Sequence, residues 1–173
     1  MIHTIQTPIT GNEDQGDLSS PFEALVQFYH AFNNRDIKEM SLNWEPSEKI
    51  AMDNPLGGIK RGWTEIAAVY KKIFNGPAKV YVEYYDYTVH EHGNFFYTVG
   101  RERGFFQSIE TQMDLSIRTS RIFRKIGKGW QQTHHHGSIE NAELLAAYQA
   151  AVTNTLYPKT QISLERCLIY EKQ

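Results

Sequence analysis

Four long runs of β-branched and aromatic residues dominate the stretch between residues 78 and 139 and dictate the kind of fold this chain can adopt. The runs cover residues 79–90, 95–104, 113–126 and 130–139, and all are rich in Val, Tyr, Phe and Thr, which favour strands. The connections at residues 91–94 and 127–129 are short enough for hairpins, so the neighbouring strands should be antiparallel. Strands of this length coil strongly, and we expect the sheet to wrap around other elements.

Helices precede the sheet and provide something for it to enclose. Ser20-Pro21-Phe22-Glu23 predicts a helix start, with Ser20 as N-cap, Pro21 in the first turn and Glu23 reaching back to the cap. The apolar residues that follow have helical spacing: Phe22, Leu25, Val26, Tyr29 and Phe32. Asp36 opens a second short helix, and a third helix ends at Gly76-Pro77. A short strand, residues 50–52, lies between the second and third helices.

The chain divides into three segments by composition. Residues 1–19 are polar and aperiodic and predict a flexible leader. Residues 20–153 form one α+β domain that ends in an amphipathic helix at about 141–152, and residues 154–173 form a C-terminal tail. A length of 173 residues suits a single domain with its own core.

Charge and cysteine content narrow the classes of partner. The formal net charge of −2 argues against a nucleic-acid or anionic-membrane surface. The one basic stretch, residues 118–128, divides its cations between two strand faces, so we expect no polyanion stripe. Cys167 is the only cysteine and cannot form an intramolecular disulfide. With neither a signal-peptide pattern nor an apolar run that could span a membrane, we expect a cytoplasmic protein.

Three motifs, in this order, carry a resemblance to a known superfamily. They are Phe28-Tyr29-His30-Ala31-Phe32-Asn33-Asn34-Arg35-Asp36, Met52-Asp53-Asn54-Pro55-Leu56-Gly57-Gly58 followed by Gly62, and Ser120-Arg121-Ile122-Phe123-Arg124-Lys125 followed by residues 129–138. Together they resemble the nuclear-transport-factor-2-like cone over residues 21–140. The second motif is similar to the stretch that carries the catalytic carboxylate of ketosteroid isomerases. The third is similar to the last hairpin of SnoaL-like domains and of the calcium/calmodulin-dependent protein kinase II association domain.

The resemblance implies a cone-like curved antiparallel sheet wrapped around N-terminal helices, with an internal pocket for a small-molecule ligand. Members of this superfamily include isomerases, dehydratases and cyclases, as well as non-catalytic binding and oligomerisation modules, so the fold does not choose a function. The resemblance also implies a homodimer formed through the sheet. We expect no cofactor.

Asp53 is the first candidate catalytic residue. A proton-abstracting carboxylate needs an apolar pocket that raises its pKa towards neutrality. In the isomerases the resemblance places that base directly before Pro-x-Gly, where this chain has Asn54, an amide that cannot act as a base. Asp53 lies one position earlier, on the opposite face of a strand. Asp53 and Asn54 have a second interpretation as turn residues before Pro55.

The two oxyanion donors of the isomerases are also altered. Their first-helix tyrosine corresponds to Phe28, and Tyr29 points about 100° away from it around the helix. Their neutral carboxylic acid corresponds roughly to Ser120. Steroid-type isomerisation by that mechanism is therefore disfavoured.

His134 and His136 form the second candidate group. On a regular strand they share a face with Gln132 and Ser138, while His135 faces the other way. A shared-face pair can relay protons near pH 7. It can also bind a metal, but that needs a third ligand, which the sequence does not supply nearby, so we assign no metal site. The third interpretation is a pair hydrogen-bonded at a pocket rim or a dimer interface.

Arg121 is the candidate anion anchor, since the resemblance to the kinase association domain places a cavity arginine here. An inward-facing arginine must meet a carboxylate, with Asp114 and Glu102 as internal possibilities, or a ligand anion. Most other strand charges should lie on a solvated face. The remaining residues expected to line the pocket are Tyr29, Trp44, Asn54, Trp63 and Tyr97.

Two functional hypotheses follow. The first is a SnoaL-like or ketosteroid-isomerase-like protein that binds a small, largely apolar ligand and transfers protons through Asp53, His134 and His136. The second is a non-catalytic ligand-binding or oligomerisation module of the same fold, favoured by the altered base and donor positions.

Overall fold

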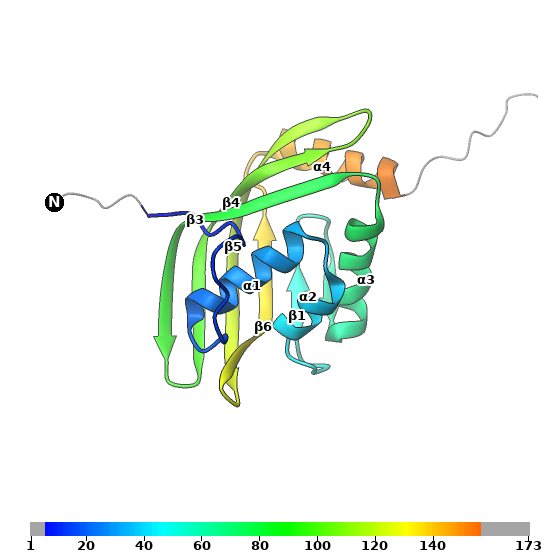
Figure 1. Cartoon of the computed structure of the whole chain (residues 1–173). Coiled ribbons are helices and arrows are strands. Elements are labelled where there is room, and N and C mark those ends of the chain that lie inside the picture. The colour runs from blue at the N-terminus through cyan, green and yellow to red at the C-terminus, as the bar shows by residue number, and fades with distance from the viewer. Residues whose placement is uncertain (1–5, 157–173) are drawn as a thin grey trace, which may run out of the picture.

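The computed structural model describes residues 6–156, an α+β fold in which helices fill the concave side of a curved sheet (Figure 1). The helices are α1 (Pro21–Asn33), α2 (Ile37–Asn43), α3 (Gly62–Asn75) and α4 (Ala142–Leu156). The strands are β1 (Ala51–Asp53), β2 (Ile59–Arg61), β3 (Lys79–His92), β4 (Phe95–Gln107), β5 (Gln112–Ile126) and β6 (Gly129–Ser138). The four long strands, the helices and the cone architecture predicted from the sequence are confirmed, whereas β2 was not predicted.

The six strands form one mixed sheet in the order β2-β1-β6-β5-β4-β3. The pairs β3–β4, β4–β5 and β5–β6 are antiparallel, as the short connections predict. The exception is the short strand β1, which runs parallel to β6, so the predicted antiparallel sheet of four long strands is part of a mixed six-stranded sheet. Parallel pairing is possible here because a long crossover, with α3 and the other three long strands, separates β1 from β6.

The first helix provides the centre of the core. Its capping box is as predicted: Ser20 Oγ accepts from the Glu23 amide, and the Glu23 carboxylate accepts from the Ser20 amide. The helix buries one side against the concave face of the sheet, with Leu25, Phe28 and Tyr29 almost fully inaccessible. The rings of four aromatic residues on α1 and α3 contact one another in this core: Phe28, Phe32, Tyr70 and Phe74. Polar atoms that reach this core must be satisfied by one another or by a ligand.

The bend of the sheet has local causes. The register between β3 and β4 shifts between Tyr85 and Thr88, which is a bulge that bends the strand. Gly104 on β4 lets the backbone of β3 approach closely, because a Cβ atom there would lie 1.9 Å from the Tyr81 carbonyl oxygen. These features curve the long strands around α1.

Part of the predicted leader packs against the domain. Ile9 is fully buried, and its backbone exchanges two 2.8 Å hydrogen bonds with Tyr84 of β3. The Trp130 indole nitrogen donates to the Ser19 carbonyl at 3.1 Å. The polar composition of this segment concealed one apolar residue that fills the core. Residues 1–5, and most of the predicted 154–173 tail, lie outside the described residues.

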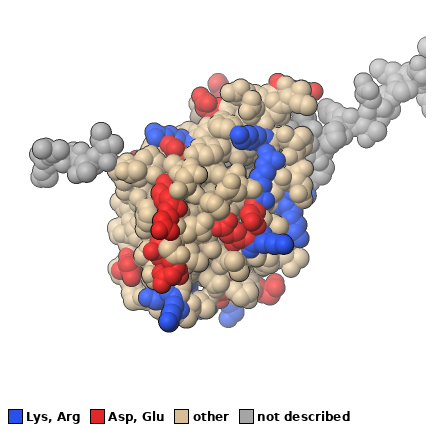
Figure 2. Space-filling view, viewed as in Figure 1, with Lys and Arg blue, Asp and Glu red and all other residues tan. Residues whose placement is uncertain are grey.

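The surface agrees with the charge balance. On the face that carries α1 and α2, acidic and basic side chains form separate small groups, and no broad basic area is visible (Figure 2). Within residues 6–156, no helix is long and apolar enough to cross a membrane.

Candidate functional site

A small cavity lies between α1, α3, α4 and the concave face of the sheet. Its volume is about 50 Å³, which by this measure holds about four water molecules. Its walls are largely apolar and its polar groups few, as is usual for ligand sites. The lining residues include Phe28, Phe32, Met52, Asn54, Pro55, Tyr70, Ile117, Glu102, Arg121, His135 and Tyr148. We call this space the inner cavity.

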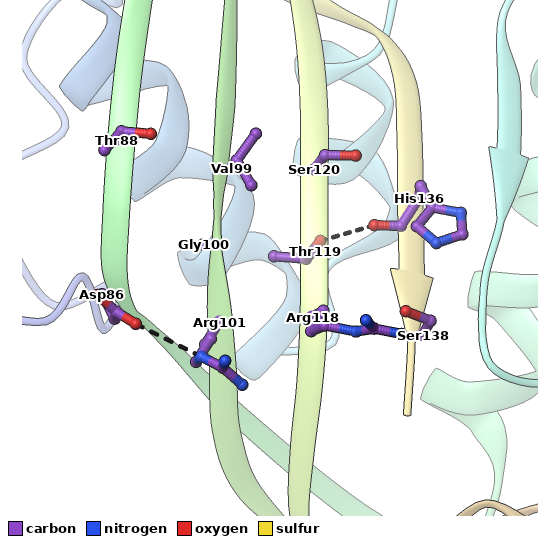
Figure 3. Close-up of a pocket in the computed structure, with 10 residues that line it drawn as sticks. All are labelled: Asp86, Thr88, Val99, Gly100, Arg101, Arg118, Thr119, Ser120, His136 and Ser138. Carbon is purple, nitrogen blue, oxygen red and sulfur yellow. Dashed lines mark hydrogen bonds and ion pairs between the residues drawn. The ribbon is translucent and has the colours of Figure 1, made fainter. Parts of the chain in front are cut away.

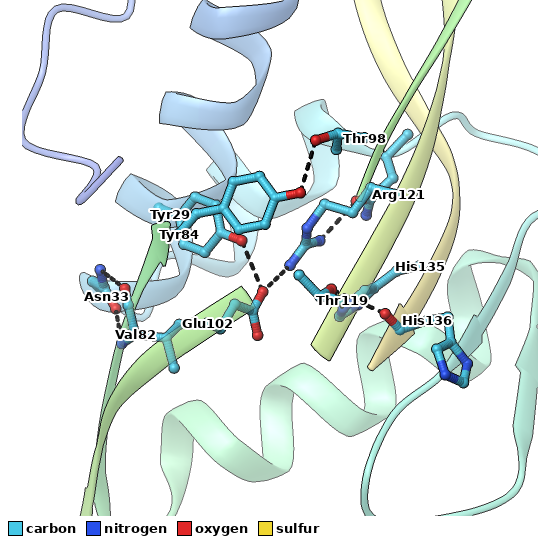
Figure 4. Close-up of polar contacts among 11 residues, drawn as sticks. Tyr29, Asn33, Val82, Tyr84, Thr98, Glu102, Thr119, Arg121, His135 and His136 are labelled. Carbon is cyan, nitrogen blue, oxygen red and sulfur yellow. Dashed lines mark hydrogen bonds and ion pairs between the residues drawn. The ribbon is translucent and has the colours of Figure 1, made fainter. Parts of the chain in front are cut away.

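A buried ion pair forms one wall of the inner cavity (Figure 4). Arg121 Nη2 lies 2.7 Å from Glu102 Oε1, and both side chains are almost fully buried. Tyr29 donates its hydroxyl to the same Glu102 oxygen at 2.8 Å, and Arg121 Nη1 donates to Gln132 Oε1 at 2.8 Å. The guanidinium also stacks on Phe28, with 3.5 Å between the guanidinium carbon and the ring centroid. Arg121 thus points inward and meets one of the two carboxylates expected from the sequence.

These contacts and burial determine the protonation states of the residues around the ion pair. Burial alone would lower the pKa of Arg121, but the neighbouring Tyr29 and Glu102 outweigh it and raise that pKa, so the guanidinium stays charged. Burial raises the pKa of Tyr29 and Tyr70, which keeps both hydroxyls neutral. With Glu102 opposite Arg121, the pair is electrically balanced. A ligand in the inner cavity therefore meets dipoles and hydrogen-bonding groups more than an unbalanced charge.

His135 faces the inner cavity as a neutral ring with a defined tautomer. Its pKa is well below the ordinary 6.5, first because of burial and then because of Arg121. Thr119 donates its single hydroxyl proton to the His136 carbonyl at 2.9 Å. The 3.1 Å contact between Thr119 Oγ1 and His135 Nε2 must therefore be donated by the ring. It follows that His135 Nδ1 carries a lone pair and acts as an acceptor.

Several polar atoms around this core have no hydrogen-bond partner among the described residues. They include His135 Nδ1 and Arg121 Nε. The Tyr70 hydroxyl has only the Trp44 indole beside it, which can donate to the hydroxyl oxygen but cannot accept its proton. Leaving a buried donor or acceptor unpaired costs about 1–3 kcal/mol each. A cavity lined by His135, with an unpaired acceptor, and by Tyr70, with a hydroxyl proton that has no acceptor, is suited to a ligand that donates one hydrogen bond and accepts another.

Asp53, His134 and His136 come together, but on the outer face of the sheet. Asp53 Oδ2 lies 2.5 Å from His136 Nδ1, and Asp53 Oδ1 lies 3.8 Å from His134 Nε2. All three side chains are between about one third and one half exposed. Their inward neighbours are Met52 and His135. We expected these three side chains to line the internal pocket. In the structure they lie on the opposite face of the sheet and do not line the inner cavity.

A bulge in β6 explains the difference. The β5–β6 register pairs Ile122 with His134 but Phe123 with Gln132, so Thr133 is an extra, unpaired residue. One extra residue reverses the side-chain alternation that follows it. Gln132 therefore points inward, whereas His134 and His136 point outward, and the predicted common face of Gln132 with the two histidines was wrong.

The other predicted site residues divide between the two faces. Asn54 lines the inner cavity, and Tyr29 reaches its wall through Glu102. Trp44 is buried in the core beside Gln132, and Trp63 is a half-buried residue packed against that core. Tyr97 lies on the outer face, where its ring stacks on His90 with 4.6 Å between centroids. The outer position of Tyr97 follows from the alternation of β4, whose even-numbered residues face inward.

Sequence reasoning missed Tyr70 and His135 as polar groups of the inner cavity. Tyr70 belongs to the apolar stripe of α3, where an aromatic residue gives no sign of which polar groups its hydroxyl meets. His135 was assigned outward because nothing in the sequence marks Thr133 as a bulge.

No group of three His, Cys, Asp or Glu side chains within residues 6–156 is arranged to hold a metal ion.

Comparison with known proteins agrees with this fold. The profile of the SnoaL-like domain family matches residues 23–142. A candidate dehydratase of the nuclear-transport-factor-2-like family from Streptomyces avermitilis is 20% identical with a TM-score of 0.63, covering 73% of this chain and 97% of that one. A ketosteroid isomerase-like protein from Erwinia carotovora atroseptica is 17% identical with a TM-score of 0.59, covering 73% and 98%.

A candidate calcium/calmodulin-dependent protein kinase type II association domain from Thiobacillus denitrificans is 21% identical with a TM-score of 0.58, covering 70% of this chain and 96% of that one. At these identities the likeness concerns the fold alone. No curated protein matches the chain.

Proposed function

Because this chain belongs to the SnoaL-like domain family, a family of the nuclear-transport-factor-2-like fold, we propose that it binds a small, neutral and largely apolar molecule in the inner cavity. The observation that carries this proposal is a pair of unused hydrogen-bonding capacities in an apolar enclosure: the acceptor His135 Nδ1, and the hydroxyl proton of Tyr70, whose neighbour Trp44 can only donate. A ligand hydroxyl can donate to the histidine nitrogen and accept from the tyrosine.

The charge balance supports a neutral ligand over a carboxylate. Arg121 already has Glu102 at 2.7 Å and Gln132 at 2.8 Å. A ligand carboxylate would have to share this cation with Glu102 in a buried place, where like charges repel strongly. Of the partners considered for Arg121 from the sequence, the internal carboxylate is therefore preferred to a ligand anion, and the polar group of the proposed ligand is a neutral hydroxyl or carbonyl.

Binding without chemistry is the simpler function of the inner cavity. His135 is a weak base because its pKa lies well below 6.5, and general bases work best when their pKa is near the working pH. Asn54 provides an amide where an isomerase would have its carboxylate. The polar groups of the cavity therefore recognise a ligand better than they would abstract a proton from it.

The matched probes for this proposal are phenol and toluene, which differ by one hydroxyl. Isothermal titration calorimetry should show phenol binding about tenfold more tightly than toluene, equivalent to about 1.4 kcal/mol. Tyr70→Phe and His135→Leu should each reduce this ratio towards one while leaving toluene binding in place. Equal affinities for the two probes in the unmodified protein would contradict the proposal.

Acid–base chemistry on the outer face is a second candidate function. The 2.5 Å contact between Asp53 and His136, with His134 beside them, favours it. A carboxylate that holds one ring nitrogen of a histidine leaves the other nitrogen free to exchange a proton with a substrate. In this proposal Asp53, His134 and His136 act on a substrate bound outside the inner cavity.

A further inference from the structure

A second concavity lies on the outer face of β4, β5 and β6, opposite the inner cavity (Figure 3). It is an open groove of about 560 Å³. We call it the outer groove. Its polar lining includes Arg101, Arg118, Ser120, His136 and Ser138.

The floor of the outer groove is built from two cross-strand rows. In the first row Arg101 of β4 lies opposite Arg118 of β5, which lies opposite Ser138 of β6. In the second row Ser120 lies opposite His136, which in turn lies opposite Asp53 of β1. The pleat directs these side chains to the same face, so two guanidinium groups, two hydroxyls and one imidazole surround one space.

The two arginines are placed at a cost to stability. Like charges directly opposite each other on neighbouring strands are destabilising. Their compensating contacts are long: 3.2 Å from Arg101 and 3.3 Å from Arg118 to the Glu140 carboxylate, and 3.4 Å from Arg101 to Asp86. All four side chains are 40–73% exposed, a setting in which ion pairs contribute little. The arginine pair is therefore poorly explained as a stabilising feature.

Glu140 shows what the arginine pair can hold. One of its oxygens contacts Arg101 and the other contacts Arg118, so the two guanidinium groups are spaced to grip two oxygens of a single anion. These contacts use one Nη1 nitrogen of each arginine. Each guanidinium has five N–H donors, so the pair has donors enough to hold a larger oxyanion in place of this carboxylate.

His136 adds a directional contact. Asp53 accepts from Nδ1, which leaves Nε2 as the nitrogen available to the outer groove. In the neutral ring Nε2 accepts a hydrogen bond. It therefore suits an anion that still carries a proton, such as hydrogen phosphate, and the hydroxyls of Ser120 and Ser138 can donate to the remaining oxygens.

We propose that the outer groove is a binding site for a phosphate group, either free or as a small phosphate monoester. Two phosphate oxygens are held by Arg101 and Arg118 in place of the Glu140 carboxylate, and the protonated oxygen donates to His136 Nε2. A planar carboxylate lacks the third and fourth oxygens that the serines and the imidazole would meet. This site is separate from the inner cavity and does not rest on the ligand proposed there.

Calorimetry with inorganic phosphate at low ionic strength tests the site. Arg118→Gln should weaken phosphate binding by about tenfold. Glu140→Gln should strengthen it several-fold, because this substitution removes the competing carboxylate. The matched control is Arg103→Gln, which removes the same charge from the outer face of β4. Arg103 does not line the outer groove, and its Nε lies 2.6 Å from Glu83 Oε1. The control should change the affinity by less than about twofold.

Three results would overturn the proposal: no phosphate binding at millimolar concentration, equal losses in Arg118→Gln and Arg103→Gln, or acetate binding as tightly as phosphate. Tighter binding of glycerol phosphate than of inorganic phosphate would identify a monoester as the ligand, and the reverse order would identify free phosphate. Both orders support the site. Arg118→Gln should leave the phenol-to-toluene ratio unchanged, so this test fails or succeeds independently of the inner cavity.

Discussion

His135 shows how a single side chain can link recognition to pH. The folded protein holds its ring neutral because the pKa lies well below 6.5, through burial first and the charge of Arg121 second. An unfolded chain exposes the same ring to water, where a histidine pKa is about 6.5. At a pH between the pKa of His135 in the folded protein and its pKa in the unfolded chain, the unfolded state binds a proton at this ring and the folded state does not.

The stability of the protein should therefore fall as the pH drops below about 6.5. Above this pH the ring is neutral in both states and contributes no pH dependence. Below it, this one group can cost up to about 1.4 kcal/mol per pH unit. Urea unfolding between pH 7.5 and 5 should show a shallower acid slope for His135→Asn than for the unmodified protein. The exposed His90→Asn is the control and should retain the full slope; identical slopes in all three proteins would contradict this account.

Only some residues of the inner cavity could be identified from the sequence. Arg121 was expected to face inward because the resemblance to the kinase association domain places a cavity arginine there, and Glu102 was one of the two carboxylates expected to meet it. His135 could not be identified, because its facing depends on a bulge that a regular alternation does not reveal. Tyr70 could not either, since the surroundings of its hydroxyl depend on three-dimensional packing.

At the level of elements, the bulge at Thr133 decides which histidines meet which partners. Residues 134 and 136 turn outward after it, and the parallel pairing of β1 with β6 brings Asp53 directly opposite His136. A short strand with one carboxylate thus supplies the hydrogen-bond acceptor that the sequence around the histidines lacks. The pairing of β1 is non-local, which is why the sequence indicated the residues but not their contact.

This pairing should fix the tautomer of His136. In the unmodified protein Asp53 accepts from Nδ1, so the neutral ring should carry its proton on that nitrogen. Ring ¹⁵N chemical shifts above pH 7.5 should show this tautomer, and Asp53→Asn should reduce its population. His90, whose ring contacts Thr88 on the outer face, is the control and should not change. On an identified substrate, Asp53→Asn should also lower turnover by about 10² or more; full turnover in that variant would exclude the acid–base proposal.

At the scale of the whole molecule, the outer face of the sheet offers an apolar area beside the outer groove. Phe95 and Ile122 are 41% and 39% exposed, and the ring stack of His90, His92 and Tyr97 lies in the same rows. Contiguous exposed apolar surface of this kind marks interaction sites. It supports the homodimer through the sheet that the sequence led us to expect, which we retain as a proposal.

Analytical ultracentrifugation at micromolar concentration should then find a dimer. Ile122→Lys should shift it to the monomer without changing the circular dichroism spectrum, because Ile122 points away from the core. The matched control is Ile59→Lys on β2, which is 54% exposed at the far edge of the sheet and should leave the dimer intact. A monomeric unmodified protein would contradict the proposal.

The architecture as a whole was predictable because it rests on local signals: strand-forming runs, hairpin-length connections and a capping box. What the sequence left open depends on contacts between distant segments. Ile9 is an example, since an isolated apolar residue in a polar leader carries no periodicity, yet its backbone pairs with Tyr84. The parallel direction of β1 is another, since no local signal specifies it.

That parallel pairing has a consequence for synthesis of the chain. Asp53 and His136 are 83 residues apart, so β1 leaves the ribosome long before the strand that completes its pairing. At about 5–20 residues per second, the interval is about 4–17 s. During this time β1 lacks its parallel partner, and β1 and β5 stay unconnected until β6 is inserted between them. The sheet therefore cannot close before β6 has been synthesised, and until then the unpaired edges of β1 and β5 are the parts of the sheet open to wrong pairing.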